Sequence, residues 1–151
     1  MIDGVTTKKL KVIPDDRGYL MEMMRSDDPF FQKFGQVYAT VCNPGIVKGW
    51  HYHKVQTDHW VIVSGEAKVA LHDRRPDSPT KGETNEFFMG EKNPMLLVIP
   101  AGVLHGFTAL EGRPAMLVNV PTELYDYDDP DEFRVPHDDP QIGYDWGVAQ
   151  G

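Results

Sequence analysis

The chain has 151 residues, of which 40% are hydrophobic and 25% are charged, the balance of a water-soluble globular protein. That length suits a single domain, which we expect to span residues 1–151. The formal net charge of −8 argues against a nucleic-acid partner, because binding to the phosphate backbone needs clustered Lys and Arg.

From the residues at the start of the sequence we expect no targeting or membrane signal. This stretch, MIDGVTTKKLKVIPDDRG, lacks the apolar core of a secretory signal. No apolar run in the chain approaches the roughly 20 residues of a membrane span. Cys42 is the single cysteine, so an internal disulfide cannot form. We therefore expect a cytoplasmic protein that has no membrane partner.

Short runs of β-forming residues follow along the chain, separated by Gly and Pro. The runs cover residues 36–41, 59–65, 66–73, 95–102 and 115–121. Strands of this length at regular spacing predict an all-β sandwich or barrel. The segment SDDPFFQKFG, residues 26–35, is the best helix candidate, and it allows one or two helical turns at most.

From Leu124 the chain becomes acidic and aromatic. This tail, residues 124–151, contains six large apolar side chains: Tyr125, Tyr127, Phe133, Ile142, Tyr144 and Trp146. A disordered segment does not carry so many large apolar groups. We expect the tail to pack on the barrel and to cross one of its mouths.

The stretch GIVKGWHYHKVQTDHWVIVSG, residues 45–65, carries the most chemical information. His51 and His53 occupy alternate positions, so on a strand they point to one face. A return strand would bring Asp58 to the same face, and His105 in PAGVLHGF would come from a further strand. Imidazole and carboxylate groups in this pattern suit either a metal such as Zn, Fe, Ni or Mn or a proton-transfer site.

These spacings resemble the cupin pattern. The first cupin motif has the form Gly-x5-His-x-His-x3-4-Glu-x6-Gly, and this chain matches it from Gly45 to Gly65 with Asp58 in place of Glu. The second motif, Pro-x-Gly-x2-His, matches Pro100, Gly102 and His105. The resemblance implies a cupin-type jelly-roll β-barrel, and many cupins of this form bind no metal.

A closer resemblance links the chain to the dTDP-4-dehydrorhamnose 3,5-epimerase family. Five segments are similar to motifs of that family, in the same order: DDRGYLMEM, VKGWHYH, HDRRPDSPTKG, IPAGVLHGF and HDDPQIGYDW. The likeness runs from about Leu10 to Trp146. It implies a homodimeric enzyme that acts on a nucleoside-diphosphate 4-keto-6-deoxy sugar and requires no cofactor.

The resemblance also implies roles for individual residues. His51 matches the family's catalytic base, and Asp139 matches the acidic residue that orients this base. Arg17, Glu22 and Gln36 match nucleotide-contacting positions, and Lys48 stands where the family usually has Arg. His105, from the second cupin motif, is expected at the same substrate site.

Three positions depart from the family pattern. Asp58 stands where the family has a lysine that stabilises the enolate, and Val118 stands near the position of the family's proton-donating tyrosine. His53 replaces a glutamine, so that KGWHYHK also resembles the Arg-Gly-x-His-Ala-His-Lys motif of sugar-nucleotide 3,4-ketoisomerases. In that interpretation His53 is a second catalytic residue, which shuttles a proton with His51.

Two hypotheses therefore stand at the level of sequence. The main one is an epimerase or isomerase that removes a proton next to the ketone of a nucleotide sugar. The alternative is a metal-binding cupin, either a small-molecule oxygenase or a non-catalytic binding module. In the alternative, a divalent metal is bound by four ligands: His51, His53, Asp58 and His105.

Overall fold

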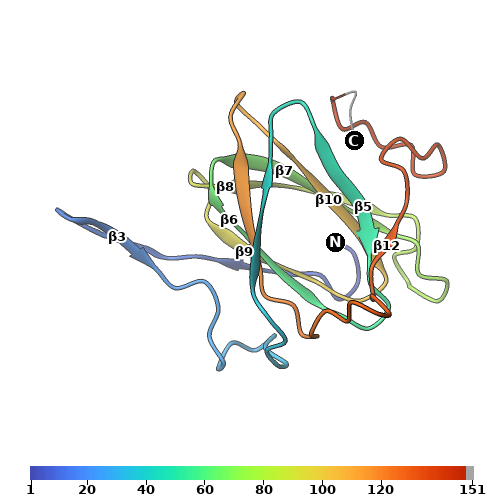
Figure 1. Ribbon diagram of the computed structural model, residues 1–151, viewed down its shortest axis with the longest axis horizontal. Helices are drawn as coiled ribbons and strands as arrows, with labels where there is room; N and C mark the ends of the chain where they lie inside the picture. Colours follow the sequence, from blue (N-terminus) through green and yellow to red (C-terminus); the bar gives the residue numbers. More distant parts are fainter. Residues whose placement is uncertain (149–151) are drawn as a thin grey trace.

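The computed structural model describes residues 1–148, and all regular secondary structure in that part of the chain is β-strand (Figure 1). Two five-stranded antiparallel sheets face each other, which confirms the all-β prediction and gives the arrangement of a jelly roll. The tail is described as far as residue 148, and the remainder of the predicted tail, 149–151, lies outside the described residues.

The first sheet has the strand order β1-β9-β6-β11-β4. Its strands are β1 (Thr6–Lys9), β9 (Met95–Ile99), β6 (Asp58–Ser64), β11 (Ala115–Asn119) and β4 (Tyr38–Cys42). The second sheet has the order β12-β5-β10-β7-β8. Its strands are β12 (Phe133–Arg134), β5 (Val47–Tyr52), β10 (Val103–Ala109), β7 (Glu66–Asp73) and β8 (Thr84–Gly90).

The main hydrophobic core fills the space between the two sheets. Trp60 and Ile62 of β6 point into it, whereas Val61 between them points to the outside of the sheet, as strand alternation requires. Leu71 of β7 and Phe107 of β10 meet them from the second sheet. Each such side chain contributes about 1.5–3 kcal/mol when it is fully removed from water, so this layer holds the sheets together.

The tail covers the outer face of the second sheet. Trp146 is buried there against Trp50 of β5, with 4.9 Å between the ring centroids. Two residues of the tail form β12, which pairs with β5 at the edge of the sheet, beside the cavity described below. The tail therefore packs on the barrel and also adds a strand to it.

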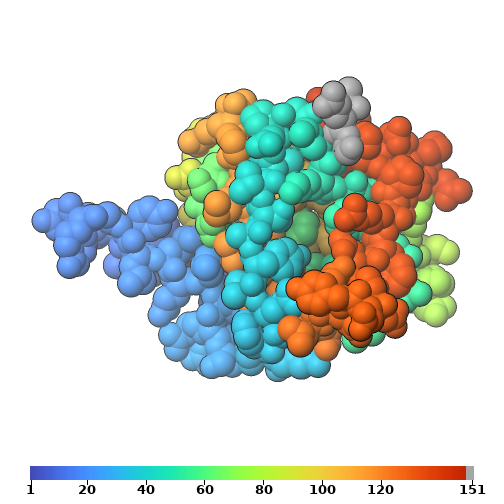
Figure 2. Space-filling view, viewed as in Figure 1, coloured from blue at the N-terminus to red at the C-terminus, as the bar shows by residue number. Residues whose placement is uncertain are grey.

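A hairpin of β2 (Val12–Asp15) and β3 (Gly18–Met21) projects from the barrel as an arm (Figures 1 and 2). Its apolar side chains are unusually exposed, with 61% of Tyr19 and 59% of Leu20 open to solvent. An isolated two-stranded hairpin is marginally stable in water, so this arm is expected to rest on another surface.

The segment 26–35, which the sequence offers as a short helix, forms turns instead. Asp28 explains the difference, because its carboxylate accepts hydrogen bonds from the Lys8 ammonium and from the backbone N–H of Arg25. These bonds tie the segment to β1 rather than to a helical ladder. Within residues 1–148, no helix is long and apolar enough to cross a membrane.

Candidate active site

A cavity of about 700 Å³ opens between the two sheets. Side chains from both sheets and from the tail line it. The polar and charged members that matter most are Gln36, Tyr38, Lys48, His51, His53, His105, Glu132 and Arg134. A volume of this size is within the usual range for a pocket that binds a small molecule.

The end of strand β5 places two histidines at this cavity: His51 lies in the strand and His53 directly follows it. His51 and His53 point inward, whereas Trp50 and Tyr52 point outward, where Trp50 packs on the tail and Tyr52 stacks on Phe133. His51 lies directly across from His105 in the antiparallel pairing of β5 with β10. The alternation expected from the sequence therefore places these three histidines on one wall.

Glycines allow β5 and β10 to approach closely beside these histidines. A Cβ atom added to Gly106 would stand 2.8 Å from the Cα atom of Gly49, a distance that real Cβ atoms do not show. The pairing register also shifts between His105 and Phe107. Such an irregularity re-aims neighbouring side chains, and here it lies among residues that line the cavity.

His51 has a carboxylate neighbour from the tail. Its Nδ1 atom lies 3.4 Å from Oε1 of Glu132, and both side chains remain partly open to the cavity. Burial lowers the pKa of His51, and the charge of Glu132 opposes this shift. A lowered pKa keeps the imidazole neutral at physiological pH, which is the form that can accept a proton.

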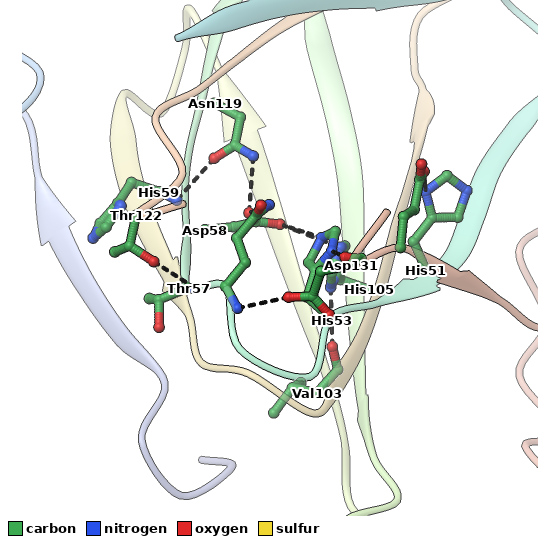
Figure 3. Close-up of polar contacts among 12 residues, drawn as sticks. His51, His53, Thr57, Asp58, His59, Val103, His105, Asn119, Thr122 and Asp131 are labelled. Atoms are coloured by element: carbon green, nitrogen blue, oxygen red, sulfur yellow. Dashed lines mark hydrogen bonds and ion pairs between the residues drawn. The ribbon is translucent and has the colours of Figure 1, made fainter. Parts of the chain in front are cut away.

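His53, Asp58 and His105 form a second, more deeply buried group (Figure 3). Oδ2 of Asp58 lies 3.1 Å from Nε2 of His53 and 3.4 Å from Nε2 of His105. Oδ1 of the same carboxylate accepts hydrogen bonds from the side-chain amides of Gln56, at 2.7 Å, and Asn119, at 3.0 Å. Asp58 is only 1% exposed, and both of its carboxylate oxygens have polar partners that replace the lost water.

Charges in this group shift one another's pKa values. Burial alone would raise the pKa of Asp58, but the hydrogen bond to His53 and the charge of His105 lower it to about 2. Burial alone would lower the pKa of His53, but Asp58 raises it above its ordinary value. Burial dominates for His105 and lowers its pKa to about 4.

The structure brings together three of the four predicted metal ligands. The ligand atoms of His53, Asp58 and His105 all lie within 4.8 Å of one another. His51 stands apart from them, beside Glu132, and its ring centroid is 6.4 Å from that of His105. The two groups are neighbours in the cavity but are chemically distinct.

The predicted substrate-binding residues fall into two sets. Gln36, Lys48 and His105 line the cavity. Arg17 and Glu22 belong to the projecting arm and are absent from the lining of their own chain's cavity. The arm therefore separates these two residues from His51 within one chain.

Asp139 does not lie beside His51, contrary to the expectation from the sequence. Its carboxylate accepts a hydrogen bond from Arg74 at 2.8 Å, and the nearby charges that lower its pKa include His72. His72 packs on Trp50, which faces the tail, whereas its neighbour Leu71 points into the core. Asp139 is thus on the outer face of the sheet, and Glu132 is the carboxylate next to His51.

Sequence reasoning missed three cavity residues used below: Glu132, Arg134 and Tyr38. The pairing of β12 with β5 brings Glu132 to His51, and a two-residue strand leaves no periodic signal in the sequence. Tyr38 begins β4 on the opposite sheet, and its hydroxyl accepts a hydrogen bond from the Asn119 amide at 2.9 Å. Its position two residues after Gln36, on the same strand face, was the available signal.

Fold and cavity together define a jelly-roll protein with a small-molecule-sized pocket that is lined by three histidines. The sequence model described as dTDP-4-dehydrorhamnose 3,5-epimerase matches residues 1–150. The chain belongs to this family of nucleotide-sugar epimerases, which confirms the resemblance seen in the sequence.

Individual relatives agree with this assignment. The spore coat polysaccharide biosynthesis protein SpsL of Bacillus subtilis is 47% identical over 148 residues, which is 98% of each chain. The probable low-salt glycan biosynthesis epimerase Agl13 of Haloferax volcanii is 43% identical, covering 97% of this chain and 96% of the relative. The crystal structure of a dTDP sugar isomerase from Desulfovibrio desulfuricans G20 superposes with a TM-score of 0.91 at 32% identity, covering 99% and 94% of the two chains.

Proposed function

We propose that this protein epimerises a nucleoside-diphosphate 4-keto-6-deoxy sugar and that His51 removes the proton next to the ketone. The observation that carries this proposal is the pairing of His51 with Glu132 at the wall of the cavity. With Nδ1 facing the carboxylate, Nε2 remains available to the substrate. Glu132 then stabilises the imidazolium that forms, as a carboxylate partner does for a general base.

Inversion also requires an acid on the opposite side of the sugar ring. Tyr38 approaches the cavity from the first sheet, whereas His51 approaches it from the second. The Tyr38 hydroxyl accepts a hydrogen bond from Asn119, so its own proton is free for donation. We assign Tyr38 as the group that returns the proton in place of the tyrosine that Val118 replaces.

Two cations of the cavity, Lys48 and Arg134, can each pair with a phosphate of such a substrate. They stand beside four carboxylates of the tail that also line the cavity: Asp126, Asp129, Asp131 and Glu132. A dTDP sugar is the expected substrate class, in keeping with the description of the family and of the Desulfovibrio relative. A cytoplasmic location remains a prediction.

The enzyme is proposed to act as a homodimer. Arg17 and Glu22 can contact a nucleotide only if the arm reaches the cavity of a second copy, because the arm projects away from its own barrel. Exposed Tyr19 and Leu20 give this arm an apolar surface for such a contact. The two chains would then exchange arms across the dimer.

The comparisons favour an epimerase over the oxygenase or binding-module alternative, since the family model spans nearly the whole chain. Ketoisomerisation differs from epimerisation in its product, so the two are separated by the experiment below.

The proposal predicts that the enzyme exchanges a carbon-bound proton of dTDP-4-keto-6-deoxyglucose with solvent deuterium. His51→Asn keeps a polar group of similar size but removes the base, so exchange measured by NMR should fall by about 100- to 10,000-fold. Binding of dTDP, measured by calorimetry, should stay within a few-fold of the wild-type affinity.

His137→Asn is the matched control, because His137 lies in the tail and does not line the cavity. It should exchange deuterium at the wild-type rate. Undiminished exchange in His51→Asn would exclude His51 as the base. A product with the ketone moved to C3 would identify a ketoisomerase instead.

A further inference from the structure

Three acceptor atoms converge beside the proposed base. Nε2 of His53, Nε2 of His105 and Oδ2 of Asp58 all point to one place (Figure 3). The other ring nitrogens determine which form of each imidazole is present. Nδ1 of His53 faces the carbonyl oxygen of Asp131, and Nδ1 of His105 lies 2.9 Å from the carbonyl oxygen of Val103.

A carbonyl oxygen can only accept a hydrogen bond, so both Nδ1 atoms carry protons. In a neutral imidazole, each Nε2 atom then presents a lone pair. These two lone pairs face a carboxylate oxygen, which is also an acceptor. The arrangement therefore needs a cation at its centre, either an extra proton or a metal ion.

The surroundings of the group resemble the outer shell of a metal site. Metal-binding histidines usually donate the second ring N–H to a carbonyl or carboxylate, and ligating carboxylates are themselves hydrogen-bonded. Both histidines here meet that description. Gln56 and Asn119 donate to Oδ1 of Asp58 and leave Oδ2 to the histidines.

The spacing of the three atoms also fits a metal. Ligands about 2.0–2.2 Å from a zinc-sized ion, at angles between octahedral and tetrahedral, lie about 3.0–3.5 Å apart. Two of the three separations fall in this range, 3.1 Å from Oδ2 of Asp58 to His53 and 3.4 Å to His105, and the two histidine ligand atoms lie within 4.8 Å of each other. A site with two histidines and one carboxylate leaves further coordination positions open, and His53 and His105 both border the cavity.

The geometry points to a divalent transition-metal site formed by His53, Asp58 and His105, with its open positions toward the sugar. Zinc, iron(II) and manganese(II) suit this ligand set. In the epimerase proposed above, His51 takes the proton from carbon and the electron pair moves onto the ketone oxygen. An ion at this site stabilises that oxygen, which compensates for Asp58 standing where the family has a lysine. His51 stays free to act as the base because it is not a ligand.

Metal content gives the direct test. Protein made without a histidine tag and purified without chelators should carry close to one divalent ion per chain by plasma mass spectrometry. His53→Ala and Asp58→Asn should lose the ion, whereas His137→Ala should retain it. Circular dichroism and thermal unfolding should confirm that the variants are folded.

A second measurement uses wild-type protein, so that its result does not depend on metal lost during purification or on variants that fail to fold. Wild-type protein stripped with dipicolinate should rebind zinc or manganese with 1:1 stoichiometry in calorimetry, and the rebound ion should raise Tm. Folded protein that carries no ion and binds none of the three metals at micromolar concentration would overturn the site and identify the central cation as a proton.

The catalytic role of the metal ion rests on the proposed epimerase function. Deuterium exchange distinguishes failure of the metal's role from failure of the epimerase proposal. Stripping the metal should lower exchange by about 100-fold or more, with recovery on adding the ion back. Exchange that is unchanged in the stripped enzyme, while His51→Asn abolishes it, would refute the role of the ion and leave the epimerase standing. Exchange that is absent from every form would refute the epimerase but not the metal site.

Discussion

Tyr38 and His51 divide the proposed reaction between two side chains that reach the substrate from opposite sheets. Burial, with the charge of Asp58 adding to it, raises the pKa of Tyr38 to about 12, so the phenol holds its proton at neutral pH. A protonated phenol beside an electron-rich enolate can act as the acid. The two residues should therefore affect different steps.

Tyr38→Phe tests this division of roles. Without the phenol, His51 should still remove the proton and return a deuteron to the same face, so wash-in at the carbon continues. Formation of the inverted product should fall by about 100-fold or more, since a general acid typically contributes that factor. NMR of one reaction mixture reports both quantities.

Tyr127→Phe provides the control, because 88% of the Tyr127 side chain is exposed and Tyr127 does not line the cavity. It should leave both quantities unchanged. Normal inversion by Tyr38→Phe would show that another group, or water, returns the proton.

Among the elements, the loop after β7 is held by one buried carboxylate. Asp73 is fully buried and accepts hydrogen bonds from the Arg75 guanidinium, the Ser78 hydroxyl and the Thr80 hydroxyl. The Arg75 hydrogen bond, followed by those of Ser78 and Thr80, holds the pKa of Asp73 far below its ordinary value although burial opposes the shift. The loop thus depends on a carboxylate charge that the folded protein loses only in strong acid.

Asp73→Asn should lower the free energy of unfolding by about 2 kcal/mol at pH 7, because charged hydrogen bonds are lost. The folded-state pKa is depressed, so the stabilisation is fully present above about pH 4, the unfolded-state value, and declines as pH falls toward the folded-state pKa. Urea unfolding at pH 7 and pH 2.5 should show a smaller difference between wild type and variant at the lower pH.

Asp77→Asn, in the same loop but exposed, should change stability by less than about 0.5 kcal/mol at either pH. An Asp73→Asn effect that does not depend on pH would assign its cost to packing rather than to charge.

Strands that coincide with runs of β-forming residues could be predicted from sequence, and short or solvent-exposed strands without such runs could not. All five predicted runs overlap a strand (β4, β6, β7, β9 and β11), because each is rich in β-branched and other apolar residues between turn signals. The arm strands β2 and β3 bury almost nothing, and β12 has two residues, so neither produces a hydrophobic period.

The same reasoning explains the outcome at the site. The similarity to the cupin spacing predicted that His53, Asp58 and His105 converge, and they do. Asp58, however, comes from the opposite sheet rather than from a return strand beside β5, because β6 belongs to the first sheet. The neighbour of His51 depends on where the tail crosses the sheet, which is a non-local property. Similarity of motifs therefore predicted Asp139 as the partner of His51. In the structure the path of the tail places Glu132 beside His51, and Asp139 pairs with Arg74.

At the scale of the whole molecule, the projecting arm is the feature that a single chain does not account for. Arg17 lies in the turn of this arm and Glu22 directly follows β3, and neither lines the cavity that contains His51. The arm also exposes Tyr19 and Leu20, and burying such side chains against a partner would stabilise a dimer. Light scattering at micromolar concentration should give the mass of two chains, and replacing Leu20 with Asp should shift it toward that of one.

Exchange of arms makes a sharper prediction for mixed dimers. His51→Asn and Arg17→Ala chains should each be poorly active as homodimers, because every site has one defect. In a heterodimer of the two, one site combines the intact His51 of one chain with the intact Arg17 of the other, and the second site carries both defects. Purified heterodimers should therefore recover the deuterium exchange of one normal site. If Arg17 served its own chain, neither site would be intact and no activity would return.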